Sequence, residues 1–187
     1  MSRILISFKT KSLILIGALV LASCTNTTQR SSNQEVATST PSVPSRLLLN
    51  SQPSPQALAN KVLEKLTAKD RAGLKALVIT QEEFCNYLWP EFPAYGTPGA
   101  TCDWVWGMDE AKSNSSLGGA INRLGGKEFK LLAIDFKEKP QIYKTYKIHM
   151  HPLVTVQVDG EELKGEVFGP VVELDGQYKL YSFYTRE

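Results

Sequence analysis

The chain has 187 residues, of which 42% are hydrophobic, and its 21 Lys and Arg residues against 19 Asp and Glu residues give a net charge of +2. This near-balance gives no basic excess that would argue for nucleic acid, whose binding depends on many Lys and Arg contacts to phosphate. No nucleic-acid partner is therefore expected.

The first 23 residues have the pattern of a secretory signal peptide. Arg3, Lys9 and Lys11 give a positive start without an acidic residue, and ten apolar or small residues follow without a break from Leu13 to Ala22. A membrane-spanning helix needs about 20 such residues, so this run is too short to span. Its length and its flanks are typical of the apolar core of a signal peptide.

Leu21-Ala22-Ser23-Cys24 ends this segment and resembles the lipobox of bacterial lipoproteins. In that family the cysteine thiol receives a diacylglycerol, the chain is cut just before the cysteine, and the new amino group is often acylated. Two or more acyl chains anchor a protein stably, whereas one anchors it only marginally. The resemblance implies a lipid on Cys24, so that the membrane is a partner. The alternative is an ordinary secretory signal with a chance cysteine.

This resemblance also implies where the protein lies. Removal of residues 1–23 takes away three positive charges, so the mature chain has a net charge near −1 (2 − 3). Such lipoproteins are cell-envelope proteins, and in Gram-negative relatives an aspartate after the cysteine favours retention in the inner membrane. Thr25 stands at that position. We therefore expect an outer-membrane anchor facing the periplasm if the source is Gram-negative.

Residues 25–55 form the next segment, and 22 of these 31 residues are Ser, Thr, Asn, Gln or Pro. They show no hydrophobic period, so they cannot bury enough apolar surface to offset the entropy of ordering. We interpret residues 24–55 as the lipidated cysteine and a disordered tether. Leu47-Leu48-Leu49 is the exception, and we expect it to be a piece of the domain's edge.

Residues 56–187 are expected to form one domain that begins with helices. Leu58, Val62, Leu63 and Leu66 recur at helical spacing. The following helices are marked by N-cap residues and by the glycines and prolines that end helices. They are predicted from Asp70 through Leu74, Leu77 and Val78, from the capping box at Thr80–Glu83 through Phe84 and Leu88, and from about Asp109 to Leu124.

After Gly126 the hydrophobic period changes to two, which is typical of strands. Strands are predicted over residues 129–136, 142–158, 163–174 and 178–184, with hairpin turns at Asp159-Gly160 and Asp175-Gly176. Helices followed by an antiparallel meander predict an α+β fold, with the helices packed on a curved sheet of about four strands.

The segments LTAKDRAGLKAL (66–77) and VVELDGQYKLYSFY (171–184) resemble nuclear transport factor 2-like domains, a cystatin-like α+β superfamily. The resemblance implies a cone of helices on a curved antiparallel sheet, with a pocket inside. Relatives with this fold include enzymes, binding modules and dimerisation units, so the fold itself does not supply a function.

Cys85 and Cys102 flank a loop rich in Pro and Gly. Because an exported protein reaches an oxidising compartment, we favour a structural disulfide between them. Two buried, reduced thiols are the alternative. No Cys-x-x-Cys motif is present, which speaks against a redox enzyme.

The same loop has an unusual density of aromatic residues around it. Trp89, Trp104 and Trp106 are candidates for the wall of a pocket for an apolar ligand, although core packing is the more common role of such residues. His149 is a further candidate, since His149 and His151 would share one face of a strand. Neither completes a metal-ligand spacing, so no metal and no other cofactor is expected.

Motifs of enzymes are missing: the chain has no Gly-x-Ser-x-Gly elbow and no complete phosphate-binding loop. Our leading hypothesis is a domain that binds a small apolar ligand or an envelope protein, and we predict no catalytic residue. An acid–base enzyme of dehydratase or isomerase type is the alternative, for which Asp103, Asp135 and His149 are conceivable bases. A homodimer built on an open sheet face is a third possibility.

Overall fold

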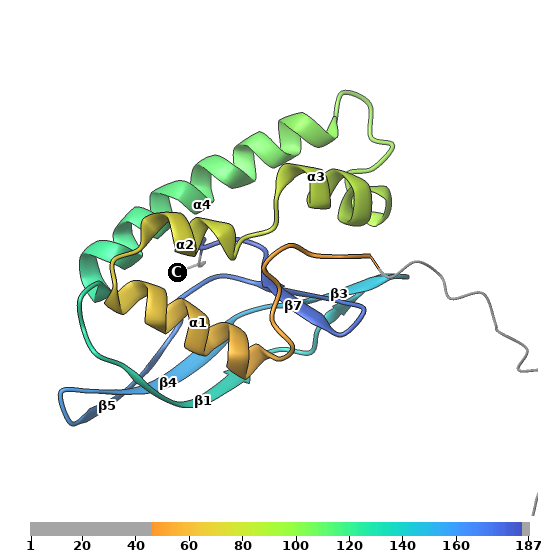
Figure 1. Cartoon of the computed structure of the whole chain (residues 1–187). Helices are drawn as coiled ribbons and strands as arrows, with labels where there is room; N and C mark the ends of the chain where they lie inside the picture. Colours follow the sequence, from red (N-terminus) through yellow and green to blue (C-terminus); the bar gives the residue numbers. More distant parts are fainter. Residues whose placement is uncertain (1–45, 185–187) are drawn as a thin grey trace, which may run out of the picture. The chain divides into compact units, whose positions relative to one another are not determined.

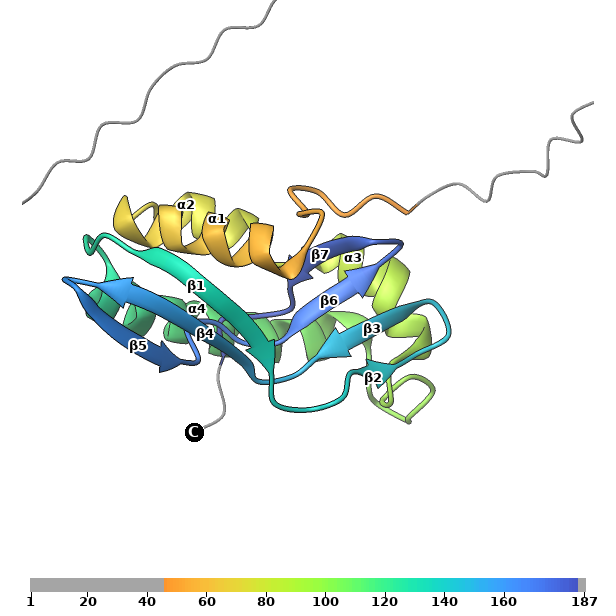
Figure 2. The same cartoon turned by 90° about the horizontal axis from the view of Figure 1, so that it is seen from below.

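The computed structural model describes residues 46–184, in which helices precede strands as the sequence predicts (Figure 1). The helices cover one face of two antiparallel sheets, as the view from below shows most clearly (Figure 2). The α+β class is thereby confirmed, with the strands arranged in two sheets that do not close into a barrel. None of the helices in residues 46–184 combines the length and the apolar character needed to cross a bilayer.

Two helices start at the predicted caps, Asp70 and Thr80, whereas the first starts at Pro55, inside the predicted tether, where Ser54 is the cap. Ser54 accepts a hydrogen bond from the Ala57 amide, and Asp70 accepts one from the Gly73 amide. Thr80 and Glu83 form the predicted capping box. The helical elements are α1 (Pro55–Thr67), α2 (Arg71–Ala76), α3 (Gln81–Glu83), the wider turn η1 (Phe84–Leu88), the tighter turn η2 (Trp89–Glu91) and α4 (Cys102–Leu124).

The start predicted for the last helix was wrong by seven residues. Helix α4 begins at Cys102 rather than Asp109, because Thr101 caps it with a side-chain hydrogen bond from the Trp104 amide at 3.3 Å. The chain therefore passes from the Pro- and Gly-rich loop directly into a helix of 23 residues.

The strands differ more from the prediction, because two long predicted strands are each interrupted. Residues 142–158 break at 143–145 and again at Met150–His151, where His151 adopts a positive φ of 48°. Residues 163–174 break at 166–170, where a Cβ on Gly169 would collide with the Tyr184 carbonyl oxygen. The strands are β1 (Lys130–Phe136), β2 (Gln141–Ile142), β3 (Tyr146–His149), β4 (Pro152–Val158), β5 (Glu161–Gly165), β6 (Val171–Leu174) and β7 (Gln177–Leu180).

These breaks divide the predicted four-stranded meander into two sheets, ordered β1-β4-β5 and β2-β3-β6-β7. The predicted turns are confirmed: Asp159-Gly160 joins β4 to β5, and Asp175-Gly176 joins β6 to β7. All four residues have a positive φ, as two-residue hairpin loops require. The last predicted strand ends at Leu180, and residues 181–184 leave the sheet.

The part of the predicted tether that the structure describes, residues 46–55, packs on the domain. Leu48 is buried, whereas Leu47 and Leu49 are exposed. The amide of Gln52 donates to the Tyr178 carbonyl at 2.8 Å, and the Tyr178 amide donates to the Gln52 carbonyl, also at 2.8 Å. The domain thus includes the chain from Arg46 onward. Cys24 and the predicted signal sequence lie outside the described residues.

Candidate functional site

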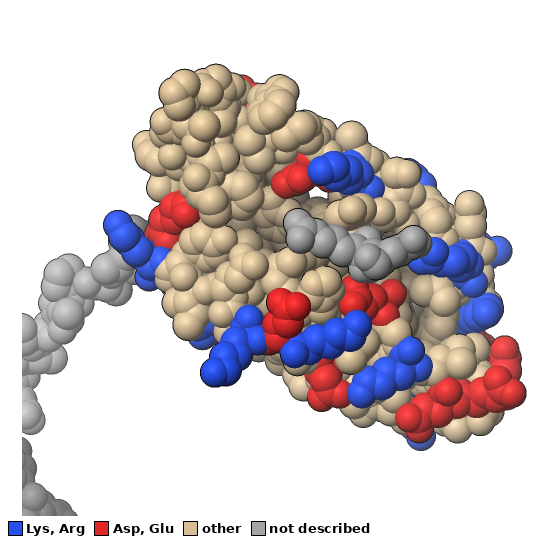
Figure 3. Space-filling model, turned by 180° about the vertical axis from the view of Figure 1, so that it is seen from behind, with Lys and Arg blue, Asp and Glu red and all other residues tan. Residues whose placement is uncertain are grey.

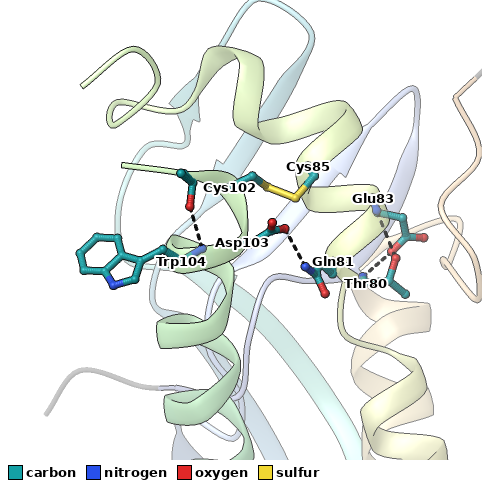
Figure 4. Close-up of a disulfide and its surroundings, with 8 residues drawn as sticks. Thr80, Gln81, Glu83, Cys85, Cys102, Asp103 and Trp104 are labelled. Atoms are coloured by element: carbon teal, nitrogen blue, oxygen red, sulfur yellow. Dashed lines mark hydrogen bonds between the residues drawn. A yellow bond between two sulfur atoms is a disulfide. The ribbon is translucent and has the colours of Figure 1, made fainter. Parts of the chain in front are cut away.

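Cys85 and Cys102 form the expected disulfide, with their Cα atoms 5.7 Å apart. The bond joins η1 to the first residue of α4 and closes the base of the loop 92–101 (Figure 4). Beside it, the Gln81 amide donates to Asp103 at 2.9 Å, a second link between α3 and α4. The Pro- and Gly-rich loop is therefore fixed at both of its ends.

The three tryptophans do not form one pocket wall. Trp89 and Trp106 are 9% and 8% exposed and belong to a core cluster around Phe84, with which their rings make contact. Trp104 is 58% exposed, and its ring points away from the disulfide (Figure 4). The common role of aromatics, core packing, applies to two of the three.

Two cavities flank helix α4. The first, which we call the sheet-side cavity, has a volume of about 360 Å³ and lies between α4, the β2–β3 region and the segment 181–184. The second, the helix-side cavity, has a volume of about 440 Å³ and lies between α2 and α4. Of the predicted pocket residues, only Trp106 lines either cavity, on the helix side. Seen from behind, the molecule is hollowed between a largely uncharged lobe and a rim of charged side chains (Figure 3).

The walls of the sheet-side cavity are mainly apolar. Phe92 and Val105 contribute from the loop and from α4, and Ile148 and Met150 contribute from β3 and the residue that follows it. Such walls, with a few polar groups among them, are typical of sites for small molecules. The size of the cavity suits a ligand of a few fused or linked rings, or a short acyl chain.

Asp109 and Tyr181 line both cavities and form the closest polar pair within them. The Tyr181 hydroxyl donates to the Asp109 carboxylate at 2.5 Å. Burial raises the pKa of Tyr181, and the nearby Asp109 charge raises it further, so the phenol keeps its proton. The segment 181–184 is held against α4 a second time, where the Phe183 amide donates to the buried Ser113 hydroxyl at 3.0 Å.

A second polar group lines the cavity at the junction of the two sheets. His151 and Glu166 lie 3.3 Å apart, and Lys137 reaches Glu166 at 3.0 Å. Within residues 46–184, no group of three or more His, Cys, Asp or Glu side chains is arranged to hold a metal ion.

The bases suggested by the sequence lie elsewhere. His149 does not line the described cavities and instead bonds Glu173 at 2.8 Å. Asp103 is exposed and bonds Gln81, and Asp135 is exposed beside Lys164. Asp109 and Tyr181 were not among the predicted site residues, because they are 72 residues apart and no motif joins them.

Comparison with protein-family models, with curated proteins and with solved structures finds no match for this chain. The resemblance to nuclear transport factor 2-like domains therefore stays a prediction. The function has to be argued from the site.

Proposed function

We propose that this protein is a lipid-anchored envelope protein whose domain binds a small, largely apolar ligand in the sheet-side cavity. The observation that carries the proposal is a cavity of about 360 Å³ with apolar walls and one half-buried hydroxyl–carboxylate pair. The walls favour apolar ligand surface, and Asp109 with Tyr181 would orient one polar group of the ligand. The lipid on Cys24 follows from the sequence pattern and belongs to the same proposal.

The test is native mass spectrometry of residues 25–187, exported to a bacterial periplasm and purified without detergent. A co-purified mass of a few hundred daltons is the expected result, and it would begin to identify the ligand. A displacement assay with the apolar dye N-phenyl-1-naphthylamine then measures the affinity of the cavity in solution.

A matched pair of variants ties the dye to this cavity. Met150→Trp fills the cavity and should abolish dye binding, because the larger side chain occupies the space between the walls. Leu132→Trp adds the same ring at a 45% exposed position outside the described cavities and should leave dye binding unchanged. Equal binding by both variants would contradict the proposal.

The second candidate function is acid–base catalysis, and the Asp109–Tyr181 pair is the observation that favours it. A carboxylate that faces a cavity can accept a proton from a bound substrate, while the phenol stabilises the resulting negative charge. Once a ligand is known, Asp109→Asn distinguishes the two functions. If the domain only binds, the wild type releases the ligand chemically unchanged. If it catalyses, the wild type converts the ligand to a product and Asp109→Asn does not.

A further inference from the structure

We propose that one end of the domain rests on the lipid bilayer through an uncharged surface, which we name the docking surface. It consists of the loop 92–101 together with the exposed side chains of Trp104 and Met108 on α4. The inference rests on the proposed lipid anchor, which would hold the domain close to a membrane. It adds a direct contact between the folded domain and the lipid.

The composition of this surface suits a bilayer interface. No Lys, Arg, Asp or Glu occurs from Phe92 to Cys102. Tyr95, Trp104 and Met108 are 59%, 58% and 39% exposed. Trp and Tyr are enriched where proteins meet the headgroup region, because their rings have apolar bodies and polar edges. In Figure 3 the corresponding lobe is largely uncharged, with one acidic patch at its upper edge. Asp103, which precedes Trp104, is exposed and accepts a hydrogen bond from Gln81 at 2.9 Å.

The nearest acidic residue before the loop is already paired inside the domain. The carboxylate of Glu91 accepts hydrogen bonds from the Thr145 hydroxyl at 2.7 Å and from the Thr145 amide at 3.2 Å. Its charge therefore faces Thr145, where it does not oppose contact between the loop and a lipid surface.

The backbone of the loop is also prepared for an apolar environment. Turn hydrogen bonds join the amides of Tyr95, Thr97 and Ala100 to carbonyls three residues earlier, at 2.8, 3.1 and 3.0 Å. Backbone groups that already have partners cost less to move out of water. The disulfide at the base of the loop reduces the entropy that binding would cost.

The position at which the predicted tether joins the domain favours the bilayer, rather than another protein, as the binding partner of the docking surface. The described chain begins at Arg46, and in two perpendicular views this orange segment starts at the end of the domain that carries the docking surface (Figures 1 and 2). Leu48 packs in the same core cluster as Trp89 and Trp106. The predicted tether from Cys24 to Arg46, treated as a random chain, would span on the order of 25 Å, so the proposed anchor would keep the bilayer within reach of this end.

The experiment uses the full lipidated chain in vesicles of phosphatidylethanolamine and phosphatidylglycerol, in which a fraction of the acyl chains is brominated. Bromine quenches tryptophan fluorescence only at short range. Trp104 is the exposed tryptophan, whereas Trp89 and Trp106 are buried. We expect brominated vesicles to quench the wild-type chain and Trp104→Phe to reduce that quenching at least about threefold.

Two further variants complete the test. Tyr95→Ser should lower the quenching of Trp104, because it removes an aromatic ring from the docking surface. Leu163→Ser changes a 47% exposed apolar side chain on β5, at the opposite end of the domain in both views, and should have no effect. Equal quenching of the wild type and Trp104→Phe, or the absence of quenching from a vesicle-bound chain, would overturn the docking surface. Concentration-dependent dimers that bury Trp104 without lipid would also overturn it.

Failure of the anchor gives a different result. A chain without lipid on Cys24 would not float with the vesicles at low lipid concentration, and mass spectrometry of the N-terminus would show a free thiol. The unlipidated chain is then titrated with the same brominated vesicles to high lipid concentration. Quenching that depends on Trp104 would support the docking surface by itself, and unchanged fluorescence would refute it.

Discussion

Lys179 and Glu83 form a buried ion pair, and its removal is the most informative stability experiment on this domain. The side chains are 0% and 5% exposed, and the Lys179 ammonium lies 2.9 and 2.7 Å from the two Glu83 oxygens. Burial lowers the pKa of Lys179, an effect that the Glu83 charge opposes. The Glu83 carboxylate also accepts hydrogen bonds from the backbone amides of Leu49 at 2.6 Å and Thr80 at 2.7 Å.

Lys179→Met leaves the Glu83 carboxylate buried with two backbone donors and no countercharge. Breaking a buried pair in this way costs about 3–5 kcal/mol of unfolding free energy. Lys75→Met is the matched control, because Lys75 bonds Glu110 at 3.0 Å on the surface, with side chains 59% and 39% exposed. Exposed pairs contribute up to about 1 kcal/mol.

The assay is urea unfolding at neutral pH with the disulfide oxidised, followed by circular dichroism. The Glu83→Gln/Lys179→Met double variant should be more stable than Lys179→Met, since it no longer contains an unpaired charge and the introduced amide oxygen still accepts a backbone hydrogen bond. The reasoning is refuted if Lys179→Met costs no more than Lys75→Met, or if the double variant is the less stable one.

Three further changes have defined outcomes in the same unfolding assay. Cys85→Ser/Cys102→Ser should cost about 3 kcal/mol, and reduction of the wild type should give an equal loss. Thr101→Ala should cost about 1 kcal/mol by removing the cap of α4, with Thr101→Ser close to the wild type. Burial disfavours the charge on Glu173, but hydrogen bonds, chiefly from Lys147, outweigh it and hold its pKa below 4.5. The loss of unfolding free energy in Glu173→Gln should therefore be largest above about pH 5 and disappear as the pH falls through that lowered pKa. A loss that does not change with pH would contradict this expectation.

The helices could be predicted because the information for them is local. Asp70 and Thr80 lie within three residues of the amides that they cap, so these two starts were predicted from the sequence. Ser54 caps α1 in the same local way, but it was assigned to the tether because the residues before it are polar. The start of α4 was missed because Thr101 follows a run of Pro and Gly, and the predicted start was placed at the later Asp109. Both hairpin turns were predicted for a similar reason, since Asp-Gly pairs favour the required positive φ.

The breaks within the predicted strands depend on contacts that are distant in the sequence. Apolar residues continue on both sides of His151 and of Gly169, and the prediction followed them past two local breaking signals, Pro152 and the Gly169-Pro170 pair. At Gly169 the constraint is the backbone of Ser182 and Tyr184, which approaches too closely for any side chain. A pattern taken from one segment cannot reveal a constraint imposed by another.

The candidate site was harder to predict for the same reason. The tryptophans attract attention because they are neighbours in sequence, yet two of them fill the core. Asp109 and Tyr181 meet only because α4 crosses the segment that leaves β7. Their pairing depends on the helix start, on the end of the last strand and on the packing between them, and sequence periodicity determines none of the three.

The buried Glu83 links the start of the described chain to the disulfide-bonded loop. Its carboxylate accepts a hydrogen bond from the Leu49 amide. Its backbone belongs to α3, which continues directly into η1 and Cys85. Gln177 holds the same segment from the other side, since it accepts the Leu48 amide at 3.0 Å and donates to the Arg46 carbonyl at 2.7 Å. A pull on a lipid anchor would act first at Arg46 and pass through these bonds into the sheet and α3. Because the same bonds fix the segment relative to α3, the start of the described chain and the disulfide-bonded loop belong to one connected part of the domain.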